Sequence, residues 1–168
     1  MTRKQLTLFL DEIESEPIEW IRRTYNPIQY DLIKSHITLC REDEIEDLTH
    51  ILINLEEIDI QQFELKTEGV KRFSNGKGVF IPVLDEEHNF RELRRLILKH
   101  AEYPPREHKA HVTIMHPRNS TCNDDIFSEI VKVKIPKILS IKKISLIEQE
   151  IGKEWRILSE FSLKKKEI

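Results

Sequence analysis

Two short stretches of the sequence share a pattern of residues that can do acid–base chemistry. His36 and Thr38 lie in SHITLC, and His111 and Thr113 lie in AHVTIM, 75 positions further along. Because the imidazole pKa is about 6.5, a pair of histidines can supply both a base and an acid near neutral pH. Threonine hydroxyls can bind the non-bridging oxygens of a phosphate. The pattern therefore predicts cleavage of a phosphodiester, with one imidazole activating the nucleophile and the other protonating the leaving oxygen.

Each motif is best read as a β-strand with one polar face. On a strand, residues two positions apart project from the same side, so each His shares a face with its Thr. The intervening positions, Ile37 and Leu39 in one copy and Val112 and Ile114 in the other, then face a core. Placing the two strands side by side would bring two imidazoles and two hydroxyls to one surface, and no metal is required for such a set.

The motifs His36-Ile37-Thr38-Leu39 and His111-Val112-Thr113-Ile114 resemble those of the 2H phosphoesterases, the superfamily that includes the bacterial 2′–5′ RNA ligase-like proteins. The resemblance implies metal-independent cleavage of 2′,3′-cyclic or 2′,5′-linked phosphodiesters of RNA ends or small nucleotides, or the reverse reaction. It assigns catalysis to His36 and His111 and phosphate contact to Thr38 and Thr113, with no cofactor. Ser35 and Ala110 stand where the family often has an apolar residue or proline.

Two other functions compete with this one. The first is a non-catalytic RNA- or nucleotide-binding module on the same fold. The second is a metal-dependent hydrolase, for which His36, Cys40, His111 and His116 are a conceivable zinc set. Their spacing matches no established zinc pattern, and it leaves the matching threonines unexplained.

Two arginines follow the motifs closely enough to bind phosphate. Arg41 comes three residues after the first motif and Arg118 five residues after the second, and a guanidinium is a bidentate phosphate donor. The alternative is an ordinary ion pair, with Glu42 or Asp43 for Arg41 and with Asp124 for Arg118.

Other residues near the motifs have simpler explanations. His108 and His116 are expected on the face opposite His111, as surface histidines, and Lys109 is also expected to point away. Aromatic residues that can stack on a nucleobase are Phe73, Tyr25, Tyr30 and Tyr103.

The elements around the motifs predict an α+β domain built from a duplicated βαβ-type unit. Helices are expected from Pro17, after Arg41, after Asp85 and from Thr121 or Asn123, and strands over 5–10, 35–40, 60–73, 78–84, 110–115, 137–150 and 154–163. Pro82 predicts an edge strand or a strand end. We expect one domain over 1–168, with two pseudo-symmetric lobes from about 17–83 and 86–162. Their antiparallel sheets would line a central cleft, with the helices outside.

Composition sets the remaining expectations. Two cysteines in 168 residues are no disulfide framework, and a net charge of -3 argues against a general nucleic-acid coat protein. The sequence contains no apolar run of about 20 residues and no signal-peptide core at its start. These features predict a cytoplasmic enzyme, with no obligate protein partner evident and a monomer possible, whose ligand is a nucleotide or RNA-end phosphodiester.

Overall fold

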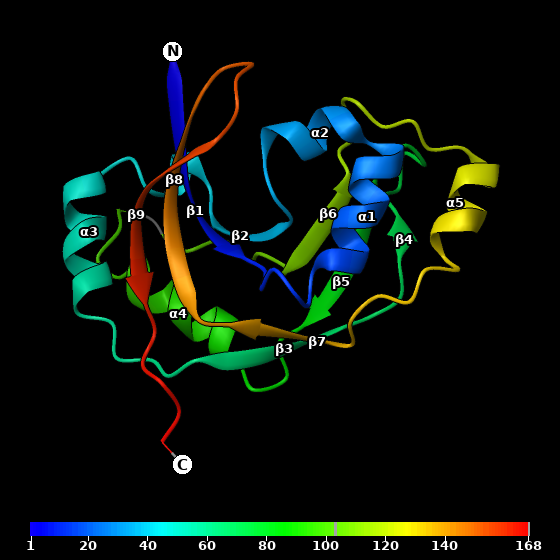
Figure 1. The fold of residues 1–168 in the computed structure, drawn as a ribbon. Coiled ribbons are helices and arrows are strands. Elements are labelled where there is room, and N and C mark those ends of the chain that lie inside the picture. The colour runs from blue at the N-terminus through cyan, green and yellow to red at the C-terminus, as the bar shows by residue number, and fades with distance from the viewer. Residues whose placement is uncertain (103, 168) are drawn as a thin grey trace.

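A computed structural model describes residues 1–102 and 104–167 of the chain (Figure 1). The elements, in chain order, are β1 (Thr2–Phe9), α1 (Glu16–Tyr25), α2 (Pro27–Leu32), β2 (His36–Cys40), the 3₁₀ turn η1 (Glu42–Glu44), α3 (Leu48–Glu56), β3 (Phe63–Thr67), β4 (Lys71–Arg72), β5 (Val79–Leu84), α4 (Asn89–Ile97), β6 (His111–Met115), α5 (Asp124–Ile130), β7 (Ile138–Ile141), β8 (Lys143–Glu150) and β9 (Arg156–Ser162). Strands and helices alternate along most of the chain, as the sequence predicts.

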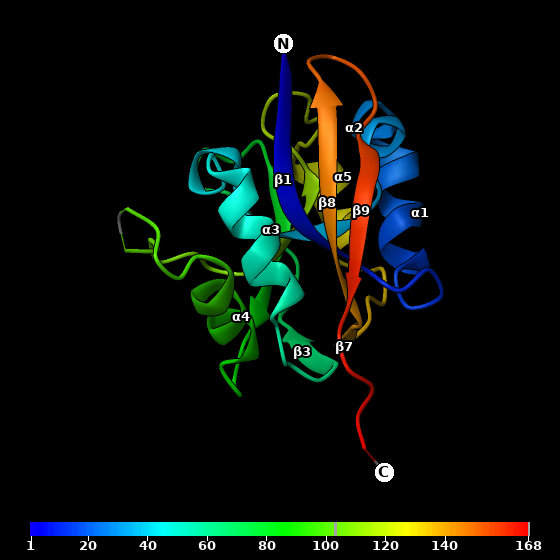
Figure 2. The ribbon, with the colours of Figure 1, turned by 90° about the vertical axis from the view of Figure 1, so that its left-hand side faces the viewer.

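The described strands form one antiparallel sheet that curls into a half-barrel. Its order is β7-β3-β5-β6-β2-β1-β8-β9, and the short strand β4 pairs with β5. Helices cover it from both sides, with α3 and α4 on one side and α1 and α2 on the other (Figure 2). The predicted α+β class is confirmed, and the two motif strands, β2 and β6, are neighbours at the centre of the sheet.

The motif strands alternate as the residue pattern requires. Ile37, Leu39, Val112 and Ile114 are completely buried, whereas the His and Thr of each motif are partly exposed. Burying one such aliphatic side chain contributes roughly 1.5–3 kcal/mol. The apolar face of each strand is therefore tightly specified, and a shift of one residue would bury both His–Thr pairs instead.

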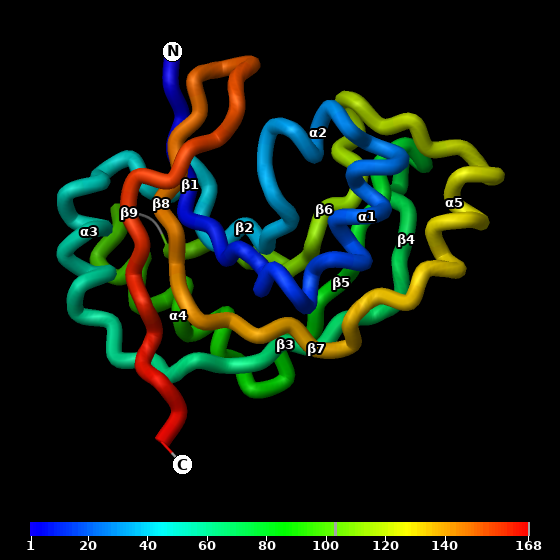
Figure 3. The backbone as a smooth tube through the Cα atoms, in the orientation of Figure 1, coloured from blue at the N-terminus to red at the C-terminus, as the bar shows by residue number. Residues whose placement is uncertain are grey.

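The two lobes do not coincide with the stretches 17–83 and 86–162. Strand β1 lies beside β2 in the same way that β5 lies beside β6, so each repeated unit begins one strand before its first helix. Strand β3, which follows the first motif, pairs with β5 and β7. Strand β8, which follows the second motif, pairs with β1 and β9. Each lobe thus contains a strand from the other unit, an exchange that can be followed along the tube in Figure 3.

Pro82 lies inside the sheet and not at an edge. It is opposite His111 in β5, between β6 on one side and β3 and β4 on the other. The carbonyl oxygen of Pro82 accepts a hydrogen bond from Glu68 N, in the gap between β3 and β4. The missing N–H points to the same side as this carbonyl and so faces the gap. The interruption of the neighbouring strand is what allows a proline here.

Local signals explain where the helices begin. Pro17 occupies the first turn of α1, and Pro27 begins α2 directly after Asn26. The side chain of Asn123 caps α5 by accepting a hydrogen bond from Ile126 N at 2.8 Å, and Asp47 caps α3 in the same way. The segment after Arg41 is divided between η1 and α3, and 137–150 forms two strands rather than one. Within 1–102 and 104–167, no helix is long and apolar enough to cross a membrane.

Candidate active site

Each motif histidine lies opposite the threonine of the other motif. Strands β2 and β6 run antiparallel, with Ile37 paired to Val112. This register sets His36 across from Thr113 and His111 across from Thr38. Side chains directly opposite each other on such strands have Cβ atoms about 4.5–5.5 Å apart. The two imidazoles and two hydroxyls therefore form one compact group on a single face, as the sequence predicts.

Matching hydrogen bonds orient the two imidazole rings. His36 Nδ1 lies 2.8 Å from the carbonyl oxygen of Lys34, and His111 Nδ1 lies 3.0 Å from that of Lys109. A carbonyl can only accept, so Nδ1 carries the proton in both rings. In the neutral form of each ring, Nε2 is then the unprotonated nitrogen. Both histidines are thus held in the same tautomer, with Nε2 free to exchange a proton with a substrate.

His36 is neutral at physiological pH. Although part of its ring reaches the surface, the pKa of His36 is lowered to about 4, mainly by burial among the surrounding protein atoms and in addition by the nearby charges of Arg22 and His111. The hydrogen bond to Lys34 O acts in the opposite direction. A neutral ring with a free Nε2 is the form that accepts a proton.

A buried ion pair holds the segment that leads into His36. Arg22 is 1% exposed, and its guanidinium binds both carboxylate oxygens of Glu19, at 3.1 and 3.0 Å, and the carbonyl of Ile33, at 2.6 Å. Glu19 also accepts a hydrogen bond from Ser35 N at 2.5 Å. Helix α1 therefore fixes the backbone on either side of Lys34, whose carbonyl orients the His36 ring.

A second buried arginine, on the helix before the second motif, connects the two units. Arg94 of α4 is 4% exposed, binds the carbonyls of Leu39 and Arg106, and pairs with Glu44 at 2.7 Å. Although burial alone would raise it, the hydrogen bonds from Arg94 hold the pKa of Glu44 at about 2. Both buried arginines have a signal in the sequence that alternation of the motifs does not reveal. An apolar residue followed by two arginines occurs once in the helix before each motif, in WIRR (20–23) and ELRR (92–95).

Comparison with known protein families agrees with this geometry. Residues 9–153 match the model of the 2′-5′ RNA ligase superfamily. The chain belongs to this superfamily, that of the 2H phosphoesterases. Membership supports a phosphodiesterase-type enzyme. A comparison with curated protein sequences gives no significant match.

Solved structures from the superfamily share the whole fold. LigT of Escherichia coli in its apo form is 13% identical, with a TM-score of 0.69 over 98% of this chain and 99% of that one. TT0787 of Thermus thermophilus is 17% identical, with a TM-score of 0.64 and coverage of 98% and 100%. A structure described only as a phosphoesterase is 14% identical, with a TM-score of 0.69 and the same coverage. At these identities the likeness shows the fold alone.

Arg41 and Arg118 form neither of the ion pairs considered as alternatives. Asp43 is bound by Arg106, and Asp124 by Arg72. Arg118 Nε lies 3.3 Å from His116 Nδ1, and both arginines are exposed. Burial is the main cause that lowers the pKa of both His108 and His116. The charge of Arg41 lowers that of His108 further, and the charge of Arg118 lowers that of His116 further. Their contact with phosphate stays a prediction for this 2H phosphoesterase.

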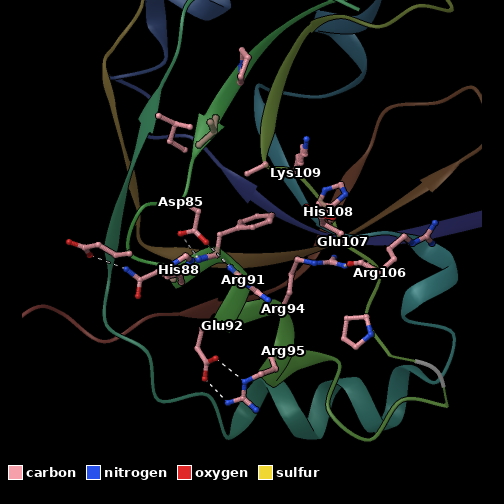
Figure 4. Close-up of a pocket in the computed structure, with 18 of the residues that line it drawn as sticks. Asp85, His88, Arg91, Glu92, Arg94, Arg95, Arg106, Glu107, His108 and Lys109 are labelled. Carbon is pink, nitrogen blue, oxygen red and sulfur yellow. Dashed lines mark hydrogen bonds and ion pairs between the residues drawn. The ribbon is translucent and has the colours of Figure 1, made fainter. Parts of the chain in front are cut away.

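His108 is closer to the site than sequence alternation suggests. Strand β6 begins only at His111, so the alternating pattern does not reach position 108. The His108 ring is half-buried, its Nε2 is 2.9 Å from the carbonyl of Thr38, and its centroid is 6.1 Å from that of His111. Lys109 also precedes β6, so alternation does not place its side chain on the face opposite His111 either. It lines, with His108, the cavity beside the site (Figure 4).

The aromatic residues considered for stacking are widely spread. The ring centroid of Phe73 lies 6.0 Å from that of His111, whereas Tyr25 packs against Trp20 and Tyr30 lies under Arg23. Tyr103 lies outside the described residues. Two more rings, absent from the sequence-based choice, contact the histidines: Phe9 at 6.0 Å from His36 and Phe80 at 5.9 Å from His111. Both come from strands that flank the motifs, so register was needed to find them.

Within the described part of the chain, no group of three or more His, Cys, Asp or Glu side chains is arranged to hold a metal ion. The suggested zinc set does not come together, because Cys40 is fully buried beside Arg94. Burial raises the pKa of the Cys40 thiol to about 12, so it is not a thiolate ligand at neutral pH.

Proposed function

We propose that this protein is a metal-independent phosphodiesterase for 2′,3′-cyclic or 2′,5′-linked phosphodiesters of RNA ends or small nucleotides. The observation that carries the proposal is the matched pair of Nδ1 hydrogen bonds, which leaves the Nε2 atoms of both His36 and His111 for the substrate. A two-histidine site needs one ring to accept a proton and the other to donate one.

In the hydrolytic direction, His36 is the base and His111 the acid. His36 Nε2 takes a proton from water as the water oxygen bonds to phosphorus. One phosphorus–oxygen bond of the diester then breaks, and its oxygen takes the Nε2 proton of the His111 ring, which enters this step doubly protonated and leaves it neutral. The low pKa of His36 supports its assignment as the base. During this step the backbone carbonyls of Lys34 and Lys109 keep accepting the Nδ1 protons, which stabilises each ring when it is positively charged.

The threonines bind the phosphate in this scheme. Because Thr38 is opposite His111 and Thr113 is opposite His36, a phosphate between the two imidazoles meets a hydroxyl on each side. Such donors act on the charge of the non-bridging oxygens in the transition state. Arg41 and Arg118 are proposed as additional contacts to the phosphate, at opposite ends of the β2–β6 strand pair. In the same superfamily, E. coli LigT was crystallised with phosphate and with 3′-AMP, which supports a nucleotide phosphate as ligand here.

The test is turnover of nucleoside 2′,3′-cyclic phosphates and a 2′,5′-linked dinucleotide in the presence of a chelator. We expect wild-type protein to be active and His36→Ala and His111→Ala each to lose at least about 100-fold in kcat, the lower end for one acid–base group. His100→Asn, an exposed site outside the motifs, is the matched control and should keep full activity. Binding without turnover by wild-type protein would instead favour the non-catalytic binding module, and activity abolished by the chelator would favour a metal-dependent hydrolase.

A further inference from the structure

The surroundings of the two histidines break the symmetry of the motifs. Strand β1 flanks β2 as β5 flanks β6, so positions on β1 and β5 correspond. Thr38 is paired with Thr7 of β1, whereas Thr113 is paired with Phe80 of β5. Thr7 is fully buried and small, and Phe80 is a large ring that is partly exposed. One unit therefore offers a hydroxyl where the other offers an aromatic surface.

Aromatic rings gather on the His111 side. Phe73, Phe80 and His108 have ring centroids 6.0, 5.9 and 6.1 Å from that of His111. Phe73 and Phe80 also stack on each other, with centroids 4.3 Å apart and planes inclined by 22°. Among the described residues, His36 has one such ring beside it, Phe9.

Two members of this aromatic group, Phe80 and His108, line a cavity of about 1360 Å³. Pro82 also lines it, and α4 forms part of its wall through Arg91 and Arg94 (Figure 4). His108 is fixed from both sides, because its Nε2 donates to the carbonyl of Thr38 and its ring stacks on Phe90. With the proton on Nε2, His108 Nδ1 remains as a hydrogen-bond acceptor.

Charges around the cavity are largely balanced. Arg94 pairs with Glu44, Arg95 with Glu92 and Arg106 with Asp43. The lining also holds Lys109, Arg91 and Glu107, so donors and acceptors of both signs are within reach. A balanced polar lining next to stacked rings fits a neutral planar group with its own donors and acceptors, which describes a nucleobase better than a chain of phosphates.

We propose that Phe73, Phe80 and His108, together with this cavity, form a nucleoside subsite, so that the substrate's base lies on the His111 side. The inference deepens the proposed function and rests on it: the substrate is a nucleoside phosphodiester, and a diester without a base is a poor one. A nucleoside placed there puts its own leaving oxygen beside His111, which agrees with His111 as the acid and His36 as the base.

The test compares a nucleoside 2′,3′-cyclic phosphate with glycerol 1,2-cyclic phosphate, a five-membered cyclic diester that has no base. Stacking of one base changes affinity by roughly 5- to 100-fold. We expect wild-type kcat/KM to favour the nucleoside substrate by at least that factor. Phe80→Thr, which copies the other unit, should remove most of the preference by lowering kcat/KM for the nucleoside substrate while changing that for the glycerol diester less than about 2-fold.

Phe73→Ser is the second variant, in case Phe80→Thr does not fold, and it should give the same selective loss. Trp20→Ala, an exposed ring on α1, is the control for unspecific effects. Equal wild-type kcat/KM for both substrates, or an equal loss for both in the folded variants, would overturn the subsite while leaving the proposed function intact. If wild-type protein turns over neither diester, the proposed function fails. Calorimetry with a nucleoside 3′-monophosphate then decides the subsite: weaker binding by Phe80→Thr supports it, and unchanged binding overturns it.

Discussion

Replacing Arg22 by methionine should strongly destabilise the protein, although none of the four motif residues is changed. The guanidinium is 1% exposed and makes two contacts with Glu19 and one with the Ile33 carbonyl. Methionine fills a similar volume, so the change leaves the largely buried Glu19 carboxylate, whose side chain is 12% exposed, without its cation. Removing one partner of a buried ion pair costs about 3–5 kcal/mol. A domain of this kind has roughly 5–15 kcal/mol of stability, so the variant should still fold.

Urea denaturation followed by circular dichroism measures this loss. The midpoint should fall while the slope of the transition stays unchanged, since the exposed surface is the same. Arg23→Met is the matched control: the neighbouring arginine forms an exposed pair with Glu16, and its replacement should leave the free energy of unfolding almost unchanged. In the double variant Arg22→Met/Glu19→Met, part of the loss should be recovered, because no uncompensated charge remains buried. A loss below about 1 kcal/mol for Arg22→Met, or an equal effect of both single variants, would refute the role assigned to burial.

Three further outcomes follow from the structure. Because the pKa of His36 is lowered to about 4 in the folded protein, its stabilising contribution should be complete above about pH 6.5. As the pH falls from there to 4, the free energy of unfolding of the wild type, measured in urea titrations, should decrease steadily relative to that of His36→Asn. Gly78→Ala should cost roughly 1–3 kcal/mol, because an added Cβ would lie 2.3 Å from a ring carbon, whereas Gly69→Ala, with no atom within 4 Å, should not; equal melting temperatures would contradict this. Under native conditions, a thiol reagent monitored by mass spectrometry should modify the partly exposed Cys122 and spare the buried Cys40; rapid labelling of Cys40 would argue against its burial.

The sequence was sufficient to place the four motif residues and to predict most of the elements. His36, Thr38, His111 and Thr113 could be placed on two polar strand faces because alternation is a local rule that needs no partner strand. The prediction that these strands are neighbours is confirmed by the pairing of Ile37 with Val112.

Long-range pairing was out of reach of the sequence. Nothing local indicates that β3 pairs with β5 and β7, or that β8 pairs with β1, so the lobes were assigned to contiguous stretches. Pro82 was misplaced for the same reason, because the gap that accommodates it lies in a neighbouring strand. Arg22 and Arg94 were not singled out, since an arginine is rarely buried without a partner, and the partners of Arg94, Glu44 and the carbonyl of Leu39, lie far from it in the sequence.

The exchange of strands between lobes also bears on the order in which the protein can be made. The lobe around His36 is completed by β8 and β9, which span residues 143–162, although β1 and β2 are finished by residue 40. While the ribosome is still adding the middle of the chain, the outer edge of β1 has no partner, and an unpaired edge is open to wrong pairing. The lobe around His36 can therefore be completed only after the last strands have been synthesised. Until then, we expect the unpaired edge of β1 to be a place where a chaperone acts during translation.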